Sequence, residues 1–304
     1  MGNFQKVVRV KAKLRMALTG VSGAGKTLGS LLIAYGITKD WDKIALIDTE
    51  HERARMYANR SDLGTGTFMY APLYPPYTAE RYMELVKEAE GIVGEDGVVI
   101  VDSFSHAWNG EGGVLERKDK IATQRNMNSY TAWNQAGKIQ NNLIGAIMNA
   151  NCHIIVTMRS KMEYASQTDE NGKLKLSKVG LAPIQRDDVE YEFDVVLDIA
   201  RDHVATASKD VTFLDAFGEI ITPELGVELK KWLNEGEEPG KIRSQLPITQ
   251  FQWKEFCAVI NDNLQIQQEV FRKFNIHRAS EIKQGQLPEL LRAAQEYTKP
   301  SNTP

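Results

Sequence analysis

Short apolar runs alternate with longer amphipathic stretches over the first two thirds of the chain. The runs are almost continuously apolar, as expected of strands that are covered on both faces. They lie at residues 43–50, 68–70, 98–102, 153–158 and 193–199. Helical patterns follow at residues 28–35, from Thr78 to Glu90 and at residues 130–149. This alternation predicts an α/β domain whose mostly parallel, twisted sheet is flanked by helices.

Other stretches have a less regular pattern. Residues 7–16 alternate between apolar side chains and the bases Arg9, Lys11, Lys13 and Arg15, which predicts an early strand with one basic face. We expect that face to be solvated, with contact to a polyanion as the alternative. Further strands are predicted at residues 203–208 and 211–214. Residues 106–129 are polar, and residues 160–188 are predicted to form a long loop or hairpin.

The end of the chain has a different composition from its beginning. Residues 1–234 are assigned to the α/β domain, and residues 235–247, rich in Gly, Pro and charge, to a linker. Residues 248–298 carry only helical patterning and predict a small helical module. Residues 299–304 are predicted to be a disordered tail.

The segment from Gly20 to Thr27 reads G-V-S-G-A-G-K-T and matches the phosphate-binding P-loop pattern G-x-x-x-x-G-K-[ST]. An apolar strand-like stretch precedes it and a helical pattern follows. Glycines let several backbone N–H groups point at one anion, and the helix N-terminus adds partial positive charge. Lys26 is expected to reach the β- and γ-phosphates, and the Thr27 hydroxyl to ligate Mg²⁺. The residues expected to bind the nucleotide are Gly20, Ser22, Gly23, Ala24, Gly25, Lys26, Thr27 and Leu28.

Bulk properties narrow the class of protein. The 304 residues carry a net charge of −3, so contact with nucleic acid would depend on local basic patches. Cys152 and Cys257 are expected to be buried free thiols, consistent with a reducing compartment. No apolar stretch is long enough to span a membrane, and the N-terminus lacks a signal-peptide pattern. We therefore expect a cytoplasmic protein without membrane contact.

Two acids follow buried strands. Asp102 ends the run Val98–Val101, and an aspartate at the end of a strand next to the P-loop strand is the Walker B arrangement, which holds Mg²⁺. Glu50 ends the strand after the P-loop helix and is the candidate general base for attack by water, with Asp48 as the competitor. The sequence therefore predicts ATP and Mg²⁺ as cofactors.

The segment I-D-T-E-H at residues 47–51, followed by R-M-Y-A at residues 55–58, resembles the corresponding segment of RecA. The resemblance implies that Glu50 activates water and that Tyr57 stacks on adenine. Ala54 stands where RecA places an aspartate between them. The runs V-D-S at 101–103, H-I-I-V-T-M-R-S-K at 153–161 and G-L-A-P-I-Q-R-D at 180–187 extend the likeness to about residues 10–235.

The last of these runs resembles a group of bacteriophage RecA-like ATPases associated with recombination and single-strand annealing. By this resemblance Thr157 senses the γ-phosphate, and the strand that carries it leads into a DNA-binding loop. Lys209 stands where related ATPases carry a finger that reaches a neighbouring subunit's γ-phosphate, although Val211 replaces the second basic residue of the pair.

Two regions are candidates for DNA contact: residues 109–129 and 160–186. Clustered bases contact phosphates, and exposed aromatic rings stack on bases. The expected DNA-binding residues are Arg159, Lys161, Lys173, Lys175, Lys178 and Arg186. Trp108, Tyr130 and Tyr164 are possible stacking platforms.

These observations predict a RecA-like, Mg²⁺-dependent ATPase that binds single-stranded DNA and assists phage homologous recombination or annealing. We expect self-association into a filament or ring with ATP at subunit interfaces, and an annealing protein or single-strand-binding protein as a further partner. One alternative is an ATP-gated recruitment module with negligible turnover. Another is a RecA-fold helicase or loader motor.

Overall fold

The computed structural model describes residues 7–124, 129–168, 174–238, 244 and 246–298. The chain divides into two compact units. One is Lys13–Leu233, and the other consists of the described residues within Met1–Ala12 and Asn234–Pro304. The predicted tail at residues 299–304 lies outside the described part of the chain.

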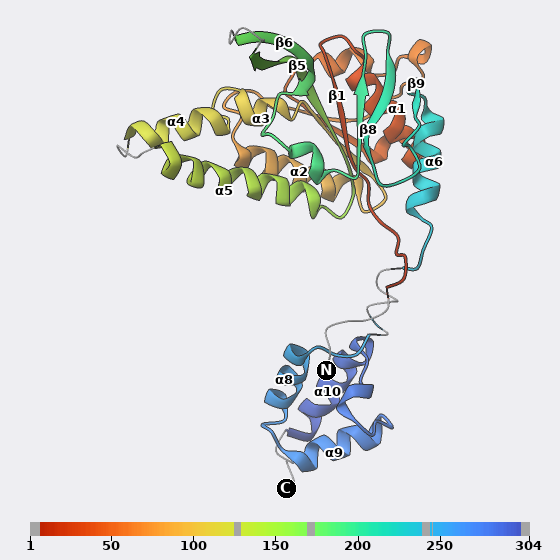
Figure 1. Cartoon of the computed structure of the whole chain (residues 1–304). Helices are drawn as coiled ribbons and strands as arrows, with labels where there is room; N and C mark the ends of the chain where they lie inside the picture. The colour runs from red at the N-terminus through yellow and green to blue at the C-terminus, as the bar shows by residue number, and fades with distance from the viewer. Residues whose placement is uncertain (1–6, 125–128, 169–173, 239–243, 245, 299–304) are drawn as a thin grey trace. The chain divides into compact units, whose positions relative to one another are not determined.

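A nine-stranded sheet forms the centre of the larger unit (Figure 1). Its strands are β1 (Arg15–Gly20), β2 (Ile44–Asp48), β3 (Met69–Pro72), β4 (Val98–Asp102), β5 (His153–Thr168), β6 (Leu174–Pro183), β7 (Val195–Ile199), β8 (Val204–Asp210) and β9 (Gly218–Ile220). The order is β3-β2-β4-β5-β1-β7-β8-β9, and β6 pairs with β5. The strands from β3 to β7 in this order are parallel, whereas β6, β8 and β9 pair antiparallel. The predicted fold class, a mostly parallel sheet flanked by helices, is confirmed.

Helices cover both faces of this sheet: α1 (Lys26–Thr38) and α6 (Pro223–Leu233) on one, α2 (Ala79–Val93) and α5 (Ser129–Met148) on the other. The short helix α3 (Ser105–Asn109) follows β4, and α4 (Val114–Gln124) packs against α5. Thr78 caps α2 as predicted, because its hydroxyl accepts a hydrogen bond from the Arg81 N–H. On α1 and α6, Gly36 and Gly226 let the two backbones pack very closely, since a Cβ on Gly36 would come within 2.0 Å of the Pro223 carbonyl oxygen.

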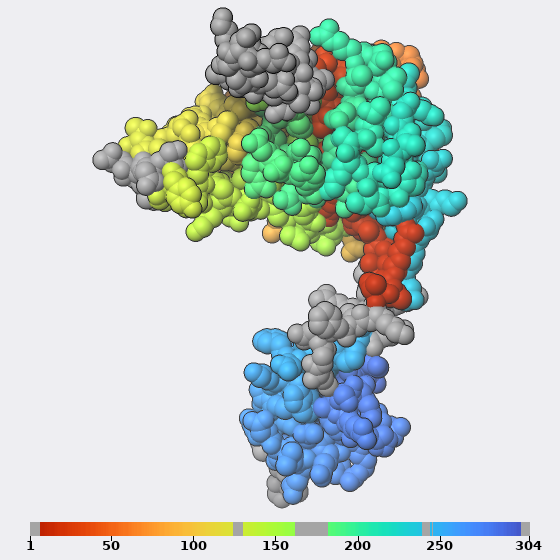
Figure 2. All heavy atoms as spheres, in the orientation of Figure 1, coloured from red at the N-terminus to blue at the C-terminus, as the bar shows by residue number. Residues whose placement is uncertain are grey.

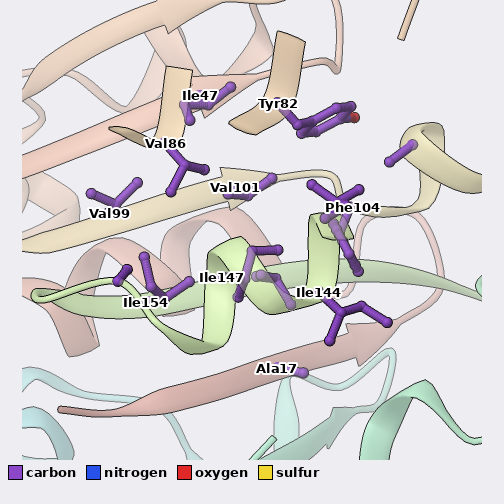
Figure 3. Close-up of a cluster of buried hydrophobic side chains, with 14 of the residues drawn as sticks. Ala17, Ile47, Tyr82, Val86, Val99, Val101, Phe104, Ile144, Ile147 and Ile154 are labelled. Atoms are coloured by element: carbon purple, nitrogen blue, oxygen red, sulfur yellow. The ribbon is translucent and has the colours of Figure 1, made fainter. Parts of the chain in front are cut away.

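The alternation along each strand divides the core into two layers. In β4, Val99 and Val101 join the cluster under α2 and α5, which also contains Tyr82 and Ile147 (Figure 3). Val98 and Ile100 face the opposite cluster, which α1 and α6 cover. Because both faces of the sheet are buried, these strands carry unbroken apolar runs and do not alternate between apolar and polar residues.

Several predicted elements differ from the observed ones. Among the described residues before β1, which begins at Arg15, only Val10 pairs, in an isolated bridge with Glu237. The strand predicted at residues 7–16 is therefore wrong for residues 7–14. Residues 211–214 form a turn closed by the Asp210 carboxylate, which accepts from the N–H groups of Thr212 and Leu214. The strand β9 and the helix α6 were not predicted, and helices α3 and α4 occupy much of the polar stretch at 106–129.

The smaller unit contains α8 (Gln250–Val259), α9 (Leu264–Lys273) and α10 (Leu287–Thr298) around its own apolar cluster. Phe256 is fully buried there, and Trp253 stacks on it with ring centroids 5.5 Å apart. These helices form a packed body in Figure 2 (blue). Thr249 and Gln252 make a capping box that fixes the start of α8.

The N-terminal segment joins this second unit through backbone pairing. The Lys11 N–H donates to the Glu237 carbonyl, and the Glu237 N–H donates to the Arg9 carbonyl. Arg9 and Lys11 form ion pairs with Glu235 and Glu238. Residues 7–12 therefore group with the C-terminal unit, although the sequence assigned them to the α/β domain. Within the described ranges, no helix is both long and apolar enough to cross a membrane.

Candidate active site

The P-loop links β1 to α1 as the sequence predicted. Gly20 has φ of +152°, and a Cβ there would lie 2.6 Å from the Ile199 carbonyl oxygen. Gly25 caps α1 in the left-handed region with φ of +98°. Lys26 begins the helix, and its ammonium donates to the carbonyls of Gly20 and Val21 at 2.8 and 2.9 Å. Burial lowers the pKa of Lys26, while the carboxylates of Asp102 and Glu50 oppose that shift.

Three polar side chains meet beside the lysine. The Thr27 hydroxyl donates to one Asp102 carboxylate oxygen at 2.5 Å, and the Thr157 hydroxyl donates to the other at 2.5 Å. Asp102 and Thr157 are both buried. Burial raises the pKa of Asp102, and the two hydroxyl hydrogen bonds act in the opposite direction. Asp102 ends β4, Thr157 lies beside it on the parallel strand β5, and Thr27 lies in the first turn of α1. The carboxyl ends of parallel strands share one edge of a sheet, where such sites form.

The strand order corrects one expectation about Asp102. Its strand, β4, is not adjacent to the P-loop strand β1, because β5 lies between them and pairs with both. This insertion places Thr157 on the strand between β1 and β4, next to Asp102. The sequence shows five strand-like runs but cannot show which run enters the sheet between two others.

Glu50 is engaged in a two-point ion pair with Arg159. The Arg159 Nε donates to Glu50 Oε1 at 2.6 Å, and Nη2 donates to Oε2. Burial opposes ionisation of Glu50, but the hydrogen bonds and charge of Arg159 prevail and hold the pKa of the carboxyl below its usual value. Arg159, predicted to contact DNA, therefore lies with its guanidinium in the site.

Asp48, the competing candidate for the base, has a different role in the structure. Its carboxylate accepts hydrogen bonds from the N–H groups of Glu50 and Ala54, at 2.6 and 3.0 Å, and from the Tyr70 hydroxyl. It is buried and shapes the turn that follows β2. These contacts favour Glu50 over Asp48 as the group that can face water.

A cavity of about 530 Å³ opens over these residues. It is lined by Ser22–Gly29, from the P-loop and the first turn of α1, and by Leu32, Glu50, Arg53, Met56, Tyr57, Asp102, Arg159, Ile199, His203, Ile220 and Ile221. Tyr57 and Leu28, which the sequence analysis expects to bind the nucleotide, line this cavity. Met56 and Ile220 are exposed apolar side chains at this cavity.

Other predicted residues lie away from the cavity lining. The Lys209 ammonium donates to the Tyr191 carbonyl, and Arg186 bonds to Asn141 and Glu192. Lys161 is exposed where the β5–β6 hairpin begins. Lys175 and Lys178 belong to strand β6, and Lys173 lies outside the described residues.

The sequence reasoning missed His203, Arg53 and the pair Ile220–Ile221. The His203 Nδ1 lies 3.0 Å from the Ala24 carbonyl oxygen, so this ring braces the P-loop from the turn between β7 and β8. No local pattern signals this role, since it depends on β7 pairing beside β1. Ile220 and Ile221 are visible in the sequence as an apolar pair. However, β9 is too short for the sequence to predict the strand or its pairing with β8.

The residues present fit a nucleotide and a divalent cation. A cavity of this size is in the usual range for small-molecule sites, and its anion-binding loop and lysine suit phosphates. A hydroxyl and a carboxylate oxygen, from Thr27 and Asp102, are hard donors of the kind Mg²⁺ takes together with water and phosphate oxygens. The described residues contain no cluster of three or more His, Cys, Asp or Glu side chains suited to a metal held by protein alone.

Fold and site together define a P-loop nucleoside triphosphatase domain. A family model for the AAA domain matches residues 12–219, and the chain belongs to this family. Membership indicates a nucleotide-dependent ATPase domain. No curated protein matches the chain.

Proposed function

We propose that the protein is a Mg²⁺-dependent ATPase that works on single-stranded DNA in phage homologous recombination or annealing. The observation that carries the ATPase part is the convergence of Lys26, Thr27, Asp102 and Glu50 on one cavity, with the buried Thr157 hydrogen-bonded to Asp102 beside it. In this proposal Lys26 binds the β- and γ-phosphates. Thr27 and Asp102 hold Mg²⁺, which neutralises charge on the phosphates when bound.

The proposed reaction is attack of water on the γ-phosphate. Glu50 orients this water and accepts its proton, and Thr157, on β5, is the proposed sensor of the γ-phosphate. Tyr57 is the proposed adenine platform at the apolar side of the cavity. Lys209 is the proposed finger that reaches the γ-phosphate of a neighbouring subunit. Its position outside the cavity of its own chain agrees with this role, which requires that the protein assembles into an oligomer.

The DNA part rests on position and on the resemblance to phage RecA-like ATPases. The strand that carries Thr157 continues directly into the β5–β6 hairpin. Only a few residues separate Thr157 from the hairpin, so binding or loss of the γ-phosphate can alter the conformation of the hairpin. Helix α5 adds exposed Tyr130 and Trp133 and contains no acidic residue. The Lys118 ammonium lies 5.0 Å from the Trp133 ring centroid, as in a cation–π contact.

The test is steady-state ATP hydrolysis with Mg²⁺, with and without single-stranded DNA, over a salt series. We expect stimulation by DNA that fades as salt rises, because phosphate contacts release counterions. Lys26→Ala is expected to abolish nucleotide binding, and Glu50→Gln to retain binding but stop turnover. Normal hydrolysis by Lys26→Ala would reject the site.

A matched pair of charge reversals locates the DNA. Lys175→Glu with Lys178→Glu, on β6, is expected to remove stimulation and leave DNA-free hydrolysis unchanged. The control is Lys87→Glu, on the exposed side of α2. Binding of ATP without any stimulation of the native chain would instead favour an ATP-gated recruitment module.

A further inference from the structure

The Glu50–Arg159 ion pair occupies the place where the proposed base has to act. A general base needs an oxygen within hydrogen-bond reach of the water from which it takes a proton. Here both carboxylate oxygens of Glu50 accept hydrogen bonds from one guanidinium. The Glu50 side chain is only 16% exposed, which leaves little room for water to replace Arg159 without a change in the pair.

The two backbones are anchored, so any change has to come from the side chains. The Arg159 N–H donates to the Ser105 hydroxyl at 2.9 Å, and its carbonyl accepts from the Ile184 N–H at 2.6 Å. Arg159 also pairs with Gly20 in the β1–β5 ladder. The Glu50 N–H is held by Asp48. Of the two side chains, that of Arg159 is longer and more exposed, at 39% against 16% for Glu50, so it has more room to change its position.

An anion in the cavity can compete for that side chain. Arg159 lines the same cavity as Lys26 and Thr27, the residues expected to seat the phosphates. Guanidinium groups bind phosphate in the same two-point geometry that they use for carboxylate. A terminal phosphate carries about −1.5 to −2 charge near neutral pH, against −1 on the carboxylate. A triphosphate reaches further from the P-loop than a diphosphate and presents that charge to Arg159.

We propose that Arg159 is a positioning residue that leaves Glu50 for the terminal phosphate when a nucleoside triphosphate binds. Glu50 then becomes available to water only while a γ-phosphate is present. A diphosphate leaves the Glu50–Arg159 pair intact. This inference rests on the proposed ATPase function and assigns Arg159 to the nucleotide, in place of the DNA contact expected from sequence.

The test is a double-mutant cycle read by nucleotide affinity. Dissociation constants for ATPγS and ADP with Mg²⁺ are measured on the full chain for the native protein, E50Q, R159A and the double variant, without DNA. With Arg159 present, E50Q removes the competitor, so ATPγS affinity is expected to rise about tenfold or more. In the R159A background the same change is expected to give less than about threefold. ADP affinity is expected to respond equally to E50Q in both backgrounds.

The cycle separates the proposal from simpler explanations. If E50Q tightens ATPγS equally with and without Arg159, Glu50 merely repels the phosphate and the proposed transfer is wrong. A native chain that binds neither nucleotide would reject the proposed function itself. Thermal unfolding of each variant checks the fold, and R159Q replaces R159A in the cycle if the alanine variant does not fold.

Discussion

Arg15, at the start of β1, provides a sharp test of how this fold is held together. Its guanidinium is buried, with the residue 7% exposed. It donates to the carbonyls of Met148, Leu14 and Cys152 at 3.1, 2.9 and 2.8 Å, and also to the Ala150 carbonyl. Met148 ends α5, Ala150 and Cys152 lie between α5 and β5, and Leu14 directly precedes Arg15. One cation thus satisfies a helix end whose carbonyls have no partner within the helix.

The expected cost of Arg15→Leu follows from these contacts. Leucine fills part of the volume but donates no hydrogen bond, so buried carbonyl groups lose a charged donor. A net value of about 1.5–3 kcal/mol applies to one hydrogen bond with a charged group, and neighbouring losses do not simply add. Because several bonds disappear together, we expect the free energy of unfolding to fall by about 3–5 kcal/mol.

The assay is urea unfolding of the full chain, with the transition of the α/β unit compared between variants. The control is Lys13→Ala, whose ammonium lies 3.7 Å from an Asp96 carboxylate oxygen in an exposed pair. Such pairs contribute about 0–1 kcal/mol. If Arg15→Leu unfolds within about 1 kcal/mol of Lys13→Ala, the reasoning from buried carbonyls is refuted.

Two further predictions concern pH and backbone packing. Burial and neighbouring cations lower the pKa of His153 to about 3, so the folded chain keeps it neutral while the unfolded chain protonates it near pH 6.5. The free energy of unfolding is therefore expected to fall as pH drops from about 6.5 toward 3, by up to about 1.4 kcal/mol per pH unit from this residue. His153→Asn removes the titrating group and is expected to flatten this dependence. Urea midpoints measured at pH 7, 5.5 and 4.5 for both proteins check this. Gly36→Ala is expected to cost about 2 kcal/mol or more, because its Cβ would meet the Pro223 carbonyl at 2.0 Å. Gly91→Ala, whose Cβ meets no heavy atom within 4 Å, is expected to be neutral or slightly stabilising, and equal denaturation midpoints for the two would contradict the packing argument.

The basic face predicted for residues 7–16 shows that a local sequence pattern does not by itself predict the environment of each side chain. The alternation of Arg9, Lys11, Lys13 and Arg15 is real, but the four side chains share no common environment. Arg9 and Lys11 pair with acids some 226 residues away, Lys13 pairs with Asp96, and Arg15 is buried under α5. Each partner comes from a distant segment, so periodicity could not distinguish a solvated face from these contacts.

The candidate site was predictable to a different degree for each residue. The P-loop is defined by a contiguous pattern, and its strand, loop and helix are all observed. Asp102 ended a recognisable buried strand, and its contact with Thr27 is observed. The Glu50–Arg159 pair joins residues 109 positions apart, one just after β2 and the other on β5, and no pattern within either segment indicates it.

The sequence by itself determined the α/β class, the phosphate-binding loop and the acids at the ends of buried strands. These follow from contiguous residues, since hydrophobic periodicity and glycine placement act over a few positions along the chain. Only the tertiary structure decided the strand order, because pairing partners are chosen by packing between distant segments. That order sets β5 between β1 and β4, brings Thr157 to Asp102 and turns Arg159 from the base of a hairpin toward Glu50.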